Sequence, residues 1–212
     1  MKKDIVILIF ALSLILNMKV SGENSSDPNN DEIGCKTIAY FNDLFDKLGL
    51  AAKQDPNYDD YREVMKPVAE SVNGFHGGSL IDPDFMIIQV YYKSHFLARG
   101  YDLKKVEDLS EFYKMMKEAP SPQLSEPGHG TILQPKLISM RYPVIKDGKL
   151  KSILSMMVKT EIYLEAVGLD KCKAYKIICQ DKIAEEKGKL SGDYKQVKLK
   201  LPSTEWIIQY QN

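Results

Sequence analysis

The feature of this sequence that most constrains its fold is a β-hairpin predicted over residues 134–160. Strands at 136–145 and 150–159 flank a tight turn whose centre is Asp147-Gly148. Asp-Gly favours the two-residue hairpin turns that need positive φ at both central positions. The second strand ends in an apolar run, 156–158, which is typical of a strand buried on both faces. The pattern predicts the middle of an antiparallel sheet.

The first 22 residues predict a secretory signal peptide. A basic start precedes an apolar run at 5–16, and the small residues at 20–22 fit cleavage before Glu23. An uncleaved anchor is the alternative, although the run is short of the roughly 20 residues that span a bilayer. We therefore expect a periplasmic or secreted protein, attached to a membrane only if the segment is not cleaved.

The rest of the chain divides into a short leader and one domain. Residues 23–31 contain no apolar side chain except a proline, and we expect them to form a flexible leader. Residues 32–212 have the size of a single ordinary domain. The chain has 29 basic and 29 acidic residues, so its charge gives no reason to expect a nucleic-acid partner.

Three cysteines occur in the chain. If Cys172 and Cys179 share one strand, the extended chain separates them by roughly 23 Å, whereas a disulfide needs Cα atoms about 4.4–6.8 Å apart. Two alternatives remain open at this point: Cys35 forms a bridge with one of these two, or all three thiols are free. With 44% hydrophobic residues, the domain does not need a disulfide to bury a core.

The order of predicted elements indicates an α+β fold. Helices are expected at 31–53, with Asp31 as N-cap, and at 58–72, 109–118 and 160–167, the last ended by Gly168; strands are expected at 85–92, 95–99, 136–145, 150–159, 173–180, 194–201 and 205–210, with a charged linker at 183–192. The tight antiparallel connections and the lack of a βαβ rhythm predict a central antiparallel sheet with the N-terminal helices packed on one face.

A series of short motifs then points to a family. In chain order they are Phe112-Tyr113-Lys114, Ser125-Glu126-Pro127, Tyr142-Pro143-Val144, Asp147-Gly148-Lys149, the apolar strand 150–158, and the closing stretch 201–207 with its single Trp206. With these motifs in this order, residues 35–212 resemble the extracytoplasmic PAS-like sensory domains called Cache (or PDC) domains. The resemblance implies a PAS-like sheet and an exported, non-enzymatic domain that binds a small molecule for signal transduction, without a cofactor.

The chain departs from the family where amino acids are bound. Members that bind amino acids carry an Arg shortly before the aromatic pair and an Asp at the end of the apolar strand. Here those places hold Leu109-Ser110-Glu111 and Val158-Lys159, so the resemblance does not support an amino-acid ligand. The alternative is a protein-interaction module with a degenerate pocket that partners an envelope sensor.

The candidate ligand-binding residues are Tyr113, Ser139, Arg141 and Tyr142. The resemblance places the ligand between the sheet and the loop and helix before the hairpin, which these residues would face. Burying Arg141 among apolar neighbours is costly unless a carboxylate, from a ligand or from the protein, pairs with it. A small-molecule carboxylate is thus one candidate partner. The alternative places Arg141 at a strand edge with its head in water, and Tyr142 in the core.

The sequence favours no catalytic or metal chemistry. His76, His95 and His129 show no metal-ligand spacing, although the Gly-rich loops around His76 and His129 would let those two approach each other. A GxSxG nucleophile motif and a phosphate-binding loop are both absent from the sequence. We therefore predict no enzymatic activity, no metal and no cofactor.

Overall fold

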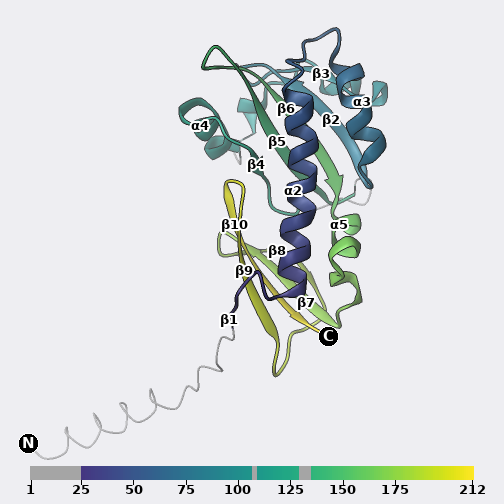
Figure 1. The fold of residues 1–212 in the computed structure, drawn as a ribbon, viewed down its shortest axis with the longest axis vertical. Helices are drawn as coiled ribbons and strands as arrows, with labels where there is room; N and C mark the ends of the chain where they lie inside the picture. Colours follow the sequence, from purple (N-terminus) through teal and green to yellow (C-terminus); the bar gives the residue numbers. More distant parts are fainter. Residues whose placement is uncertain (1–24, 107–108, 129–134) are drawn as a thin grey trace, which may run out of the picture.

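The computed structural model describes residues 25–106, 109–128 and 135–212 of the chain. These residues form helices and two five-stranded sheets, and both sheets lie beside one long helix (Figure 1). The predicted α+β class is confirmed. The strands divide between two sheets, however, where the sequence predicted one. The predicted signal peptide lies outside the described residues, and no helix of the described part is long and apolar enough to cross a membrane.

The predicted hairpin lies at the centre of the first sheet, called here the upper sheet. Its order is β3-β2-β6-β5-β4, with bounds β2 Phe75–Ile81, β3 Ile87–Val90, β4 Gln123–Leu124, β5 Leu137–Lys146 and β6 Lys149–Lys159. Asp147 and Gly148 have φ values of 50° and 72°, as the predicted turn requires. Residues 95–99 were predicted as a strand. Residues 95–98 instead belong to the 3₁₀ helix η1 (Lys93–Ala98) and Arg99 is its C-cap, because the chain turns away after β3.

The second sheet, called here the lower sheet, contains the C-terminal strands. Its order is β1-β9-β10-β7-β8, with bounds β1 Ser25–Ser26, β7 Ala174–Cys179, β8 Lys182–Lys187, β9 Lys195–Leu201 and β10 Thr204–Gln211. The predicted linker at 183–192 is wrong in its first half, because β8 pairs with β7 and buries Ala184 and Glu185 despite its charged sequence. Only tertiary pairing makes this charged stretch a strand.

Four α-helices and three 3₁₀ segments surround the sheets among the described residues. They are α2 Glu32–Ala52, α3 Tyr61–Ser71, η1, η2 Leu103–Lys105, α4 Ser110–Glu118, α5 Thr160–Val167 and η4 Leu169–Lys171. Helix α2 runs along both sheets (Figure 1). Its Phe41 ring stacks on Tyr163 and meets Trp206 of β10 edge-on, with ring centroids 5.1 Å and 5.3 Å apart, respectively. These aromatic contacts join α2, α5 and the lower sheet into one core.

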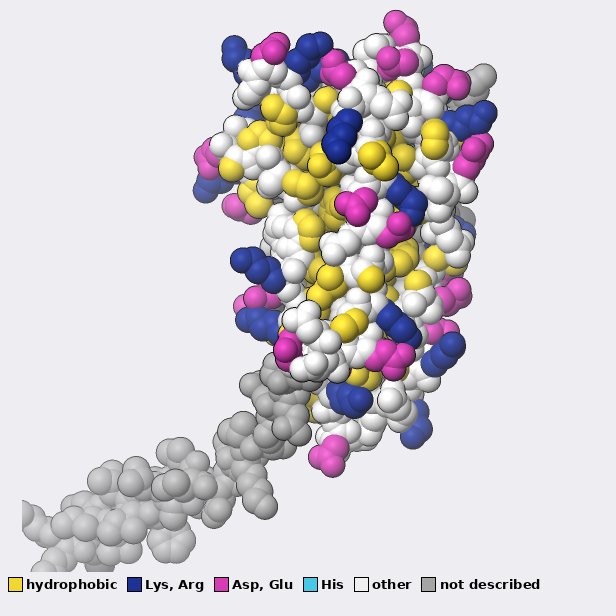
Figure 2. All heavy atoms as spheres, viewed as in Figure 1, with side chains coloured by type: hydrophobic (Ala, Val, Ile, Leu, Met, Phe, Trp, Pro, Cys, Tyr) yellow, Lys and Arg dark blue, Asp and Glu magenta, His cyan; other side chains and the backbone are white. Residues whose placement is uncertain are grey.

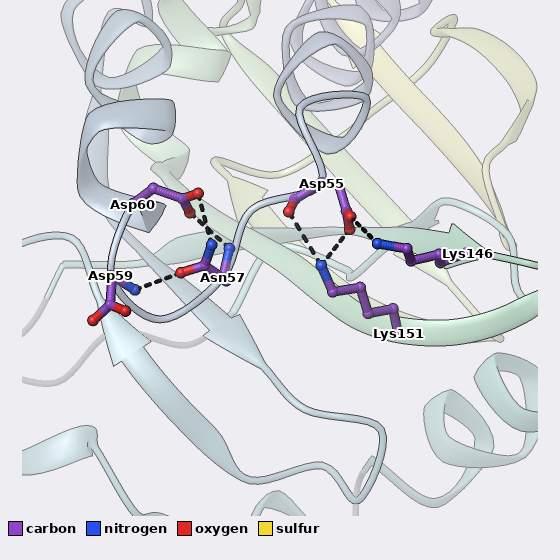
Figure 3. A network of polar contacts seen from close by, with 6 residues as sticks. All are labelled: Asp55, Asn57, Asp59, Asp60, Lys146 and Lys151. Atoms are coloured by element: carbon purple, nitrogen blue, oxygen red, sulfur yellow. Dashed lines mark hydrogen bonds and ion pairs between the residues drawn. The ribbon is translucent and has the colours of Figure 1, made fainter.

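A polar network ties the end of α2 to the hairpin (Figure 3). The Asp55 carboxylate accepts hydrogen bonds from Lys146 Nζ, at 2.9 Å, and from Lys151 Nζ. Hydrogen bonds from these two lysines, Lys146 first, lower the pKa of Asp55. In the next loop, Asn57 donates from its backbone and side chain to Asp60 at 2.7 and 2.8 Å. The turn after α2 is therefore held against the turn end of the hairpin.

The surface carries charges of both signs, and the cysteines are unpaired. Figure 2 shows Lys/Arg and Asp/Glu side chains interspersed around one face, with hydrophobic side chains running down its middle. All three cysteines are free, Cys35 exposed and Cys172 and Cys179 buried. Of the two alternatives for the cysteines, the structure has the one without a bridge.

The segment before α2 is ordered against the lower sheet. Residues 25–31 were expected to belong to a flexible leader, but β1 pairs in parallel with β9. Asp31 is the predicted N-cap of α2: its carboxylate accepts from Gly34 N at 2.9 Å and from the Tyr210 hydroxyl at 2.7 Å. The polar sequence gave no sign of this docking, because Asp31 finds its buried partner at the far end of the chain.

Replacing Asp31 with Ala is expected to destabilise the protein by roughly 2–4 kcal/mol, since it removes an N-cap and leaves the buried Tyr210 hydroxyl without its acceptor. Thermal unfolding of the two proteins measures this loss. Asp59→Ala is the matched control, because the Asp59 side chain points away from the network in Figure 3. It should change stability by less than about 0.5 kcal/mol. Equal effects of the two substitutions would contradict the role of Asp31.

Candidate ligand-binding site

A row of polar residues crosses the face of the upper sheet that α4 covers. Strand pairing places Ser79 opposite Ser155, Ser155 opposite Arg141, and Arg141 opposite Gln123. Residues directly opposite each other on neighbouring strands share one face of the sheet. Phe112 of α4 packs near this row, in a cluster with Ile153 and others. The row therefore lies beneath α4.

Arg141 is the cation of this row. It is partly buried, and its Nε atom is fully buried without a hydrogen-bond partner. Its guanidinium lies over the ring of Phe112, 4.5 Å from the centroid. Burial lowers the pKa of Arg141 to about 10, so the side chain keeps its charge at neutral pH. In the described part of the chain, no carboxylate forms an ion pair with it.

The alternative position of Arg141, at a sheet edge, is not the one observed. Strand β4 pairs with β5 on the side away from β6, with Gln123 opposite Arg141. This short strand lies in a stretch where the sequence pattern predicted no strand. Arg141 therefore has a strand on each side.

Gln123 adds a second unpaired donor next to Arg141. Its side chain is 4% exposed, and its Nε2 atom is buried with no hydrogen-bond partner. Two buried donors on adjacent strands thus lack acceptors. Native proteins pair nearly all such groups, so each unpaired one needs an explanation.

Both side chains line a hollow of about 420 Å³. Its wall combines apolar side chains from α4 and the preceding segment, polar side chains from β4 and β5, and the ends of two hairpins of the lower sheet. The residues that line it are Val106, Leu109, Glu111, Phe112, Met115, Gln123, Leu124, Ser125, Glu126, Gly128, Leu137, Ser139, Arg141, Cys179, Gln180, Ser203 and Thr204. This size is in the range of small-molecule sites.

The structure brings together two of the four predicted site residues. Ser139 and Arg141 line the hollow. Ser139 is held in place by two backbone contacts with Ser125: its N–H donates to Ser125 Oγ at 2.8 Å, and its carbonyl accepts from Ser125 N at 2.8 Å. Their spacing of two along β5 puts both side chains on the same face.

Tyr113 supports the hollow without lining its described wall. Its hydroxyl donates to the Leu103 carbonyl. Its ring centroid lies 4.7 Å from that of Phe85 and 5.3 Å from that of Phe112. Burial raises the pKa of Tyr113, an effect that the nearby Arg141 charge partly offsets. Tyr113 thus packs against the ring on which Arg141 rests.

Tyr142 lies on the opposite face of β5. It packs beside Gly49 of α2, where a Cβ atom would come within 3.2 Å of the tyrosine hydroxyl. Because successive side chains of a strand alternate between faces, Arg141 and Tyr142 cannot face the same hollow. The structure therefore does not bring Tyr142 to the candidate site, and it has the core position that was the alternative.

Several residues of the hollow were not singled out from the sequence. Gln123 is recognisable only through its register with Arg141, and Ser203 and Thr204 reach the site from about 60 residues further along the chain. Phe112 was noted as part of a motif, but nothing in the motif indicates the cation–π contact.

Two of the three histidines lie next to each other. His76 lies next to His95, with ring centroids 5.6 Å apart, while His129 lies outside the described residues. Within the described ranges, no group of three or more His, Cys, Asp or Glu side chains could hold a metal ion.

Comparison with known proteins identifies the fold. No protein-family model and no curated protein matches the chain. An extracellular ligand-binding receptor from Desulfohalobium retbaense is similar with a TM-score of 0.64 and 13% identity, over 84% of this chain and 39% of the receptor. The ligand-binding domain of the Pseudomonas aeruginosa amino-acid chemoreceptor PctC, in complex with GABA, is similar with a TM-score of 0.58 and 14% identity, over 84% of this chain and 94% of that domain. The chain has the fold of a Cache-type sensory domain.

Another Cache-type structure supports the same conclusion. The ligand-binding domain of the Pseudomonas fluorescens chemoreceptor CtaA, in complex with L-valine, has a TM-score of 0.59 and 14% identity, over 82% of this chain and 89% of that domain. The resemblance inferred from the motifs is thus confirmed at the level of the fold. The family resemblance implies an Asp at the end of β6 in members that bind amino acids. In this chain Lys159 stands there and forms an ion pair with Glu161 at 3.5 Å.

Proposed function

We propose that this protein is an exported, non-enzymatic sensory domain that binds a small-molecule carboxylate in the hollow beside Arg141. The observation that carries the proposal is the pair of buried donors, Arg141 and Gln123, which lie in register without acceptors. A buried donor left unpaired costs roughly 1–3 kcal/mol, and a buried charge costs more. Such a cost is understandable where a ligand supplies the missing acceptors.

A carboxylate matches these donors better than a neutral acceptor does. The guanidinium is a planar fork that can bind both oxygens of a carboxylate, and charge-assisted hydrogen bonds are about twice as strong as neutral ones. The Gln123 amide can donate to one of the same oxygens. Phe112 fixes the plane of the guanidinium from below, since the two groups are 4.5 Å apart.

The comparisons support this proposal without deciding the ligand. GABA and L-valine, named in the PctC and CtaA complexes, both carry a carboxylate. The structural neighbours are ligand-binding domains, and one is described as extracellular. We accordingly place the protein in the periplasm or outside the cell.

Acetate and formate provide a direct test, because they are small enough to enter the hollow whatever the natural ligand is. Thermal unfolding is measured with 0–100 mM of each sodium salt, and sodium chloride at equal ionic strength is the control. We expect both carboxylates to raise the unfolding temperature in a saturable way, since a ligand that binds only the native state stabilises it. Indistinguishable curves in acetate, formate and chloride would overturn the proposal.

Gln123→Leu tests the second donor in the same assay. The substitution introduces an apolar side chain of similar size and removes the unpaired amide. We expect acetate affinity to fall about tenfold, which corresponds to about 1.4 kcal/mol, while the ligand-free protein keeps or gains stability. Unchanged acetate affinity would exclude Gln123 from the site.

A further inference from the structure

The hollow at Arg141 lies between the two sheets. Arg141, Gln123 and Ser139 belong to the upper sheet, but Ser203 and Thr204 come from the β9–β10 turn of the lower sheet. Gln180, at the β7–β8 turn, lines the same wall. A molecule that fills the hollow would therefore touch both sheets.

The β7–β8 and β9–β10 turns of the lower sheet lie near the site and have unusual backbone conformations. Gln180, Asp181 and Ser203 have φ values of 49°, 62° and 61°, although none is glycine. Positive φ at both Gln180 and Asp181 suits the two-residue β7–β8 turn. Pro202 followed by a positive φ at Ser203 suits a type II turn between β9 and β10. These conformations leave the Ser203 and Thr204 side chains at the end of the lower sheet that faces the upper sheet.

A single backbone donor links the β9–β10 turn to the site. Leu124 N–H lies 3.1 Å from the Pro202 carbonyl and 3.3 Å from Ser203 Oγ. Leu124 directly follows Gln123, which is paired with Arg141. The turn is therefore connected through β4 to the donor pair that we assign to the carboxylate.

The same turns have open space on their other side. A second hollow, of about 280 Å³, is lined by Gln180, Ser203 and Thr204 together with Asp181, Glu205 and two isoleucines. Packing therefore does not hold these turns from both directions. A ligand in the first hollow can add contacts that the ligand-free turns lack.

Two sets of residues that line the first hollow differ in chemistry. Arg141 and Gln123 offer donors to an anion. Ser203, Thr204 and Gln180 offer uncharged groups that both donate and accept hydrogen bonds. A carboxylate group alone fills only part of a 420 Å³ space.

We propose that the ligand bridges the two sheets, with its carboxylate on Arg141 and Gln123 and an uncharged hydrogen-bonding group of its body on Ser203 and Thr204. Binding then adds contacts to the hydrogen bonds that already link the β9–β10 turn to the upper sheet. This inference rests on the carboxylate site proposed above and adds to it a second point of recognition, in the other sheet. The ligand class is a carboxylate that also carries a hydroxyl or amide group several bonds away.

Two probes separate the two sets of residues. Acetate carries only the carboxylate that Arg141 and Gln123 would bind, whereas 5-hydroxypentanoate also carries a hydroxyl at its far end that Ser203 and Thr204 would bind. Calorimetric titration of the full chain should show at least fivefold tighter binding of 5-hydroxypentanoate than of acetate. Thr204→Val and Ser203→Gly should remove that advantage by lowering the affinity for 5-hydroxypentanoate to that for acetate. Valine matches threonine in shape, and glycine accepts the positive φ of position 203, so both variants are expected to fold.

Ser191→Ala is the matched control, because Ser191 is an exposed serine between β8 and β9 of the same sheet. It should leave both affinities unchanged. Hydrogen–deuterium exchange gives an independent readout: 5-hydroxypentanoate should protect the amides of residues 203–206, and acetate should not.

The outcomes distinguish this inference from the proposed function. If acetate binds but 5-hydroxypentanoate binds no more tightly, or if its affinity is unaffected by Thr204→Val and Ser203→Gly, the bridging inference is overturned and the carboxylate site stands. If neither probe binds, the carboxylate site itself fails, and the bridge with it.

Discussion

Replacing Arg141 with Met is expected to raise the stability of the ligand-free protein while abolishing carboxylate binding. Arg141 has a buried Nε without a partner, and no carboxylate of the described residues forms an ion pair with it. Replacing buried charges by apolar side chains of similar volume often stabilises a protein by about 1–4 kcal/mol. The lost contact with Phe112 opposes this gain by about 0.5–2 kcal/mol. We expect a net gain of about 1 kcal/mol, or about 2–4 °C in unfolding temperature for a chain of this size.

Binding should respond in the opposite direction. Truncating one partner of a buried, hydrogen-bonded charge pair costs about 2–5 kcal/mol of binding free energy. We therefore expect the acetate affinity of Arg141→Met to fall at least about thirtyfold, which the thermal-shift titration measures. A residue that lowers stability in order to bind a ligand is a common feature of functional sites.

Arg99→Met is the matched control, because Arg99 is exposed and also lies over an aromatic ring, at 5.5 Å from Tyr58. It should change stability by less than about 0.5 kcal/mol and leave acetate binding intact. If Arg141→Met proves clearly less stable than Arg99→Met, the guanidinium is a structural group and the ligand argument loses its basis.

Alkaline pH is expected to unfold the protein cooperatively, starting above pH 10. Tyr61, Tyr163, Tyr175 and Tyr210 are each less than 5% exposed. Burial raises the pKa of all four, that of Tyr175 to about 12. Burial also raises the pKa of the Cys179 thiol to about 12. The native state therefore holds these protons at pH values where the unfolded chain releases them.

The direction of the effect follows from proton linkage. Below about pH 10, the tyrosines are protonated in both states and their stabilising contribution is complete. Above that pH, the unfolded chain ionises first, so each tyrosine removes up to about 1.4 kcal/mol of stability per pH unit until its native pKa is reached. Arg141 acts in the opposite sense, because its lowered pKa lets the native state release a proton first. Because several buried groups lower the free energy of unfolding and only Arg141 raises it, the net change is a loss of stability. This loss exceeds a typical stability of about 5–15 kcal/mol within a few pH units.

Circular dichroism and tyrosinate absorbance, followed together from pH 8 to 12.5, measure this transition. We expect both signals to change together for the buried tyrosines. Tyr61→Phe should move the midpoint to higher pH, since the Tyr61 hydroxyl is buried without a partner. Tyr194→Phe, at an exposed tyrosine, should not move it. Complete ionisation of the twelve tyrosines near pH 10 with the fold intact would contradict the prediction.

Local patterns in the sequence determined the parts of the fold that depend on neighbouring residues. The Asp147-Gly148 turn, the Asp31 N-cap and the Gly168 helix end are all confirmed, because each depends on backbone geometry within a few positions. The motif order also led to the Cache-type fold. Charge patterning was less informative: it predicted a linker where β8 lies, since pairing with β7 overrides the local preference.

The candidate site was only partly predictable. The sequence singled out Arg141 as a cation in an apolar strand and Ser139 on the same face, and both line the hollow. Tyr113 and Tyr142 were chosen with them, but α4 turns Tyr113 behind Phe112, and strand alternation sends Tyr142 to α2.

By itself, the sequence determined the hairpin, the helix ends and the presence of a cation that needs a partner. Only the tertiary structure decided that β4 would cover the free side of β5, that Gln123 would lie beside Arg141 without an acceptor, and that the lower sheet would complete the wall. The physical reason is range. Turns and caps are fixed by interactions across a few residues, whereas a binding site is fixed by the burial and register of segments that lie far apart along the chain.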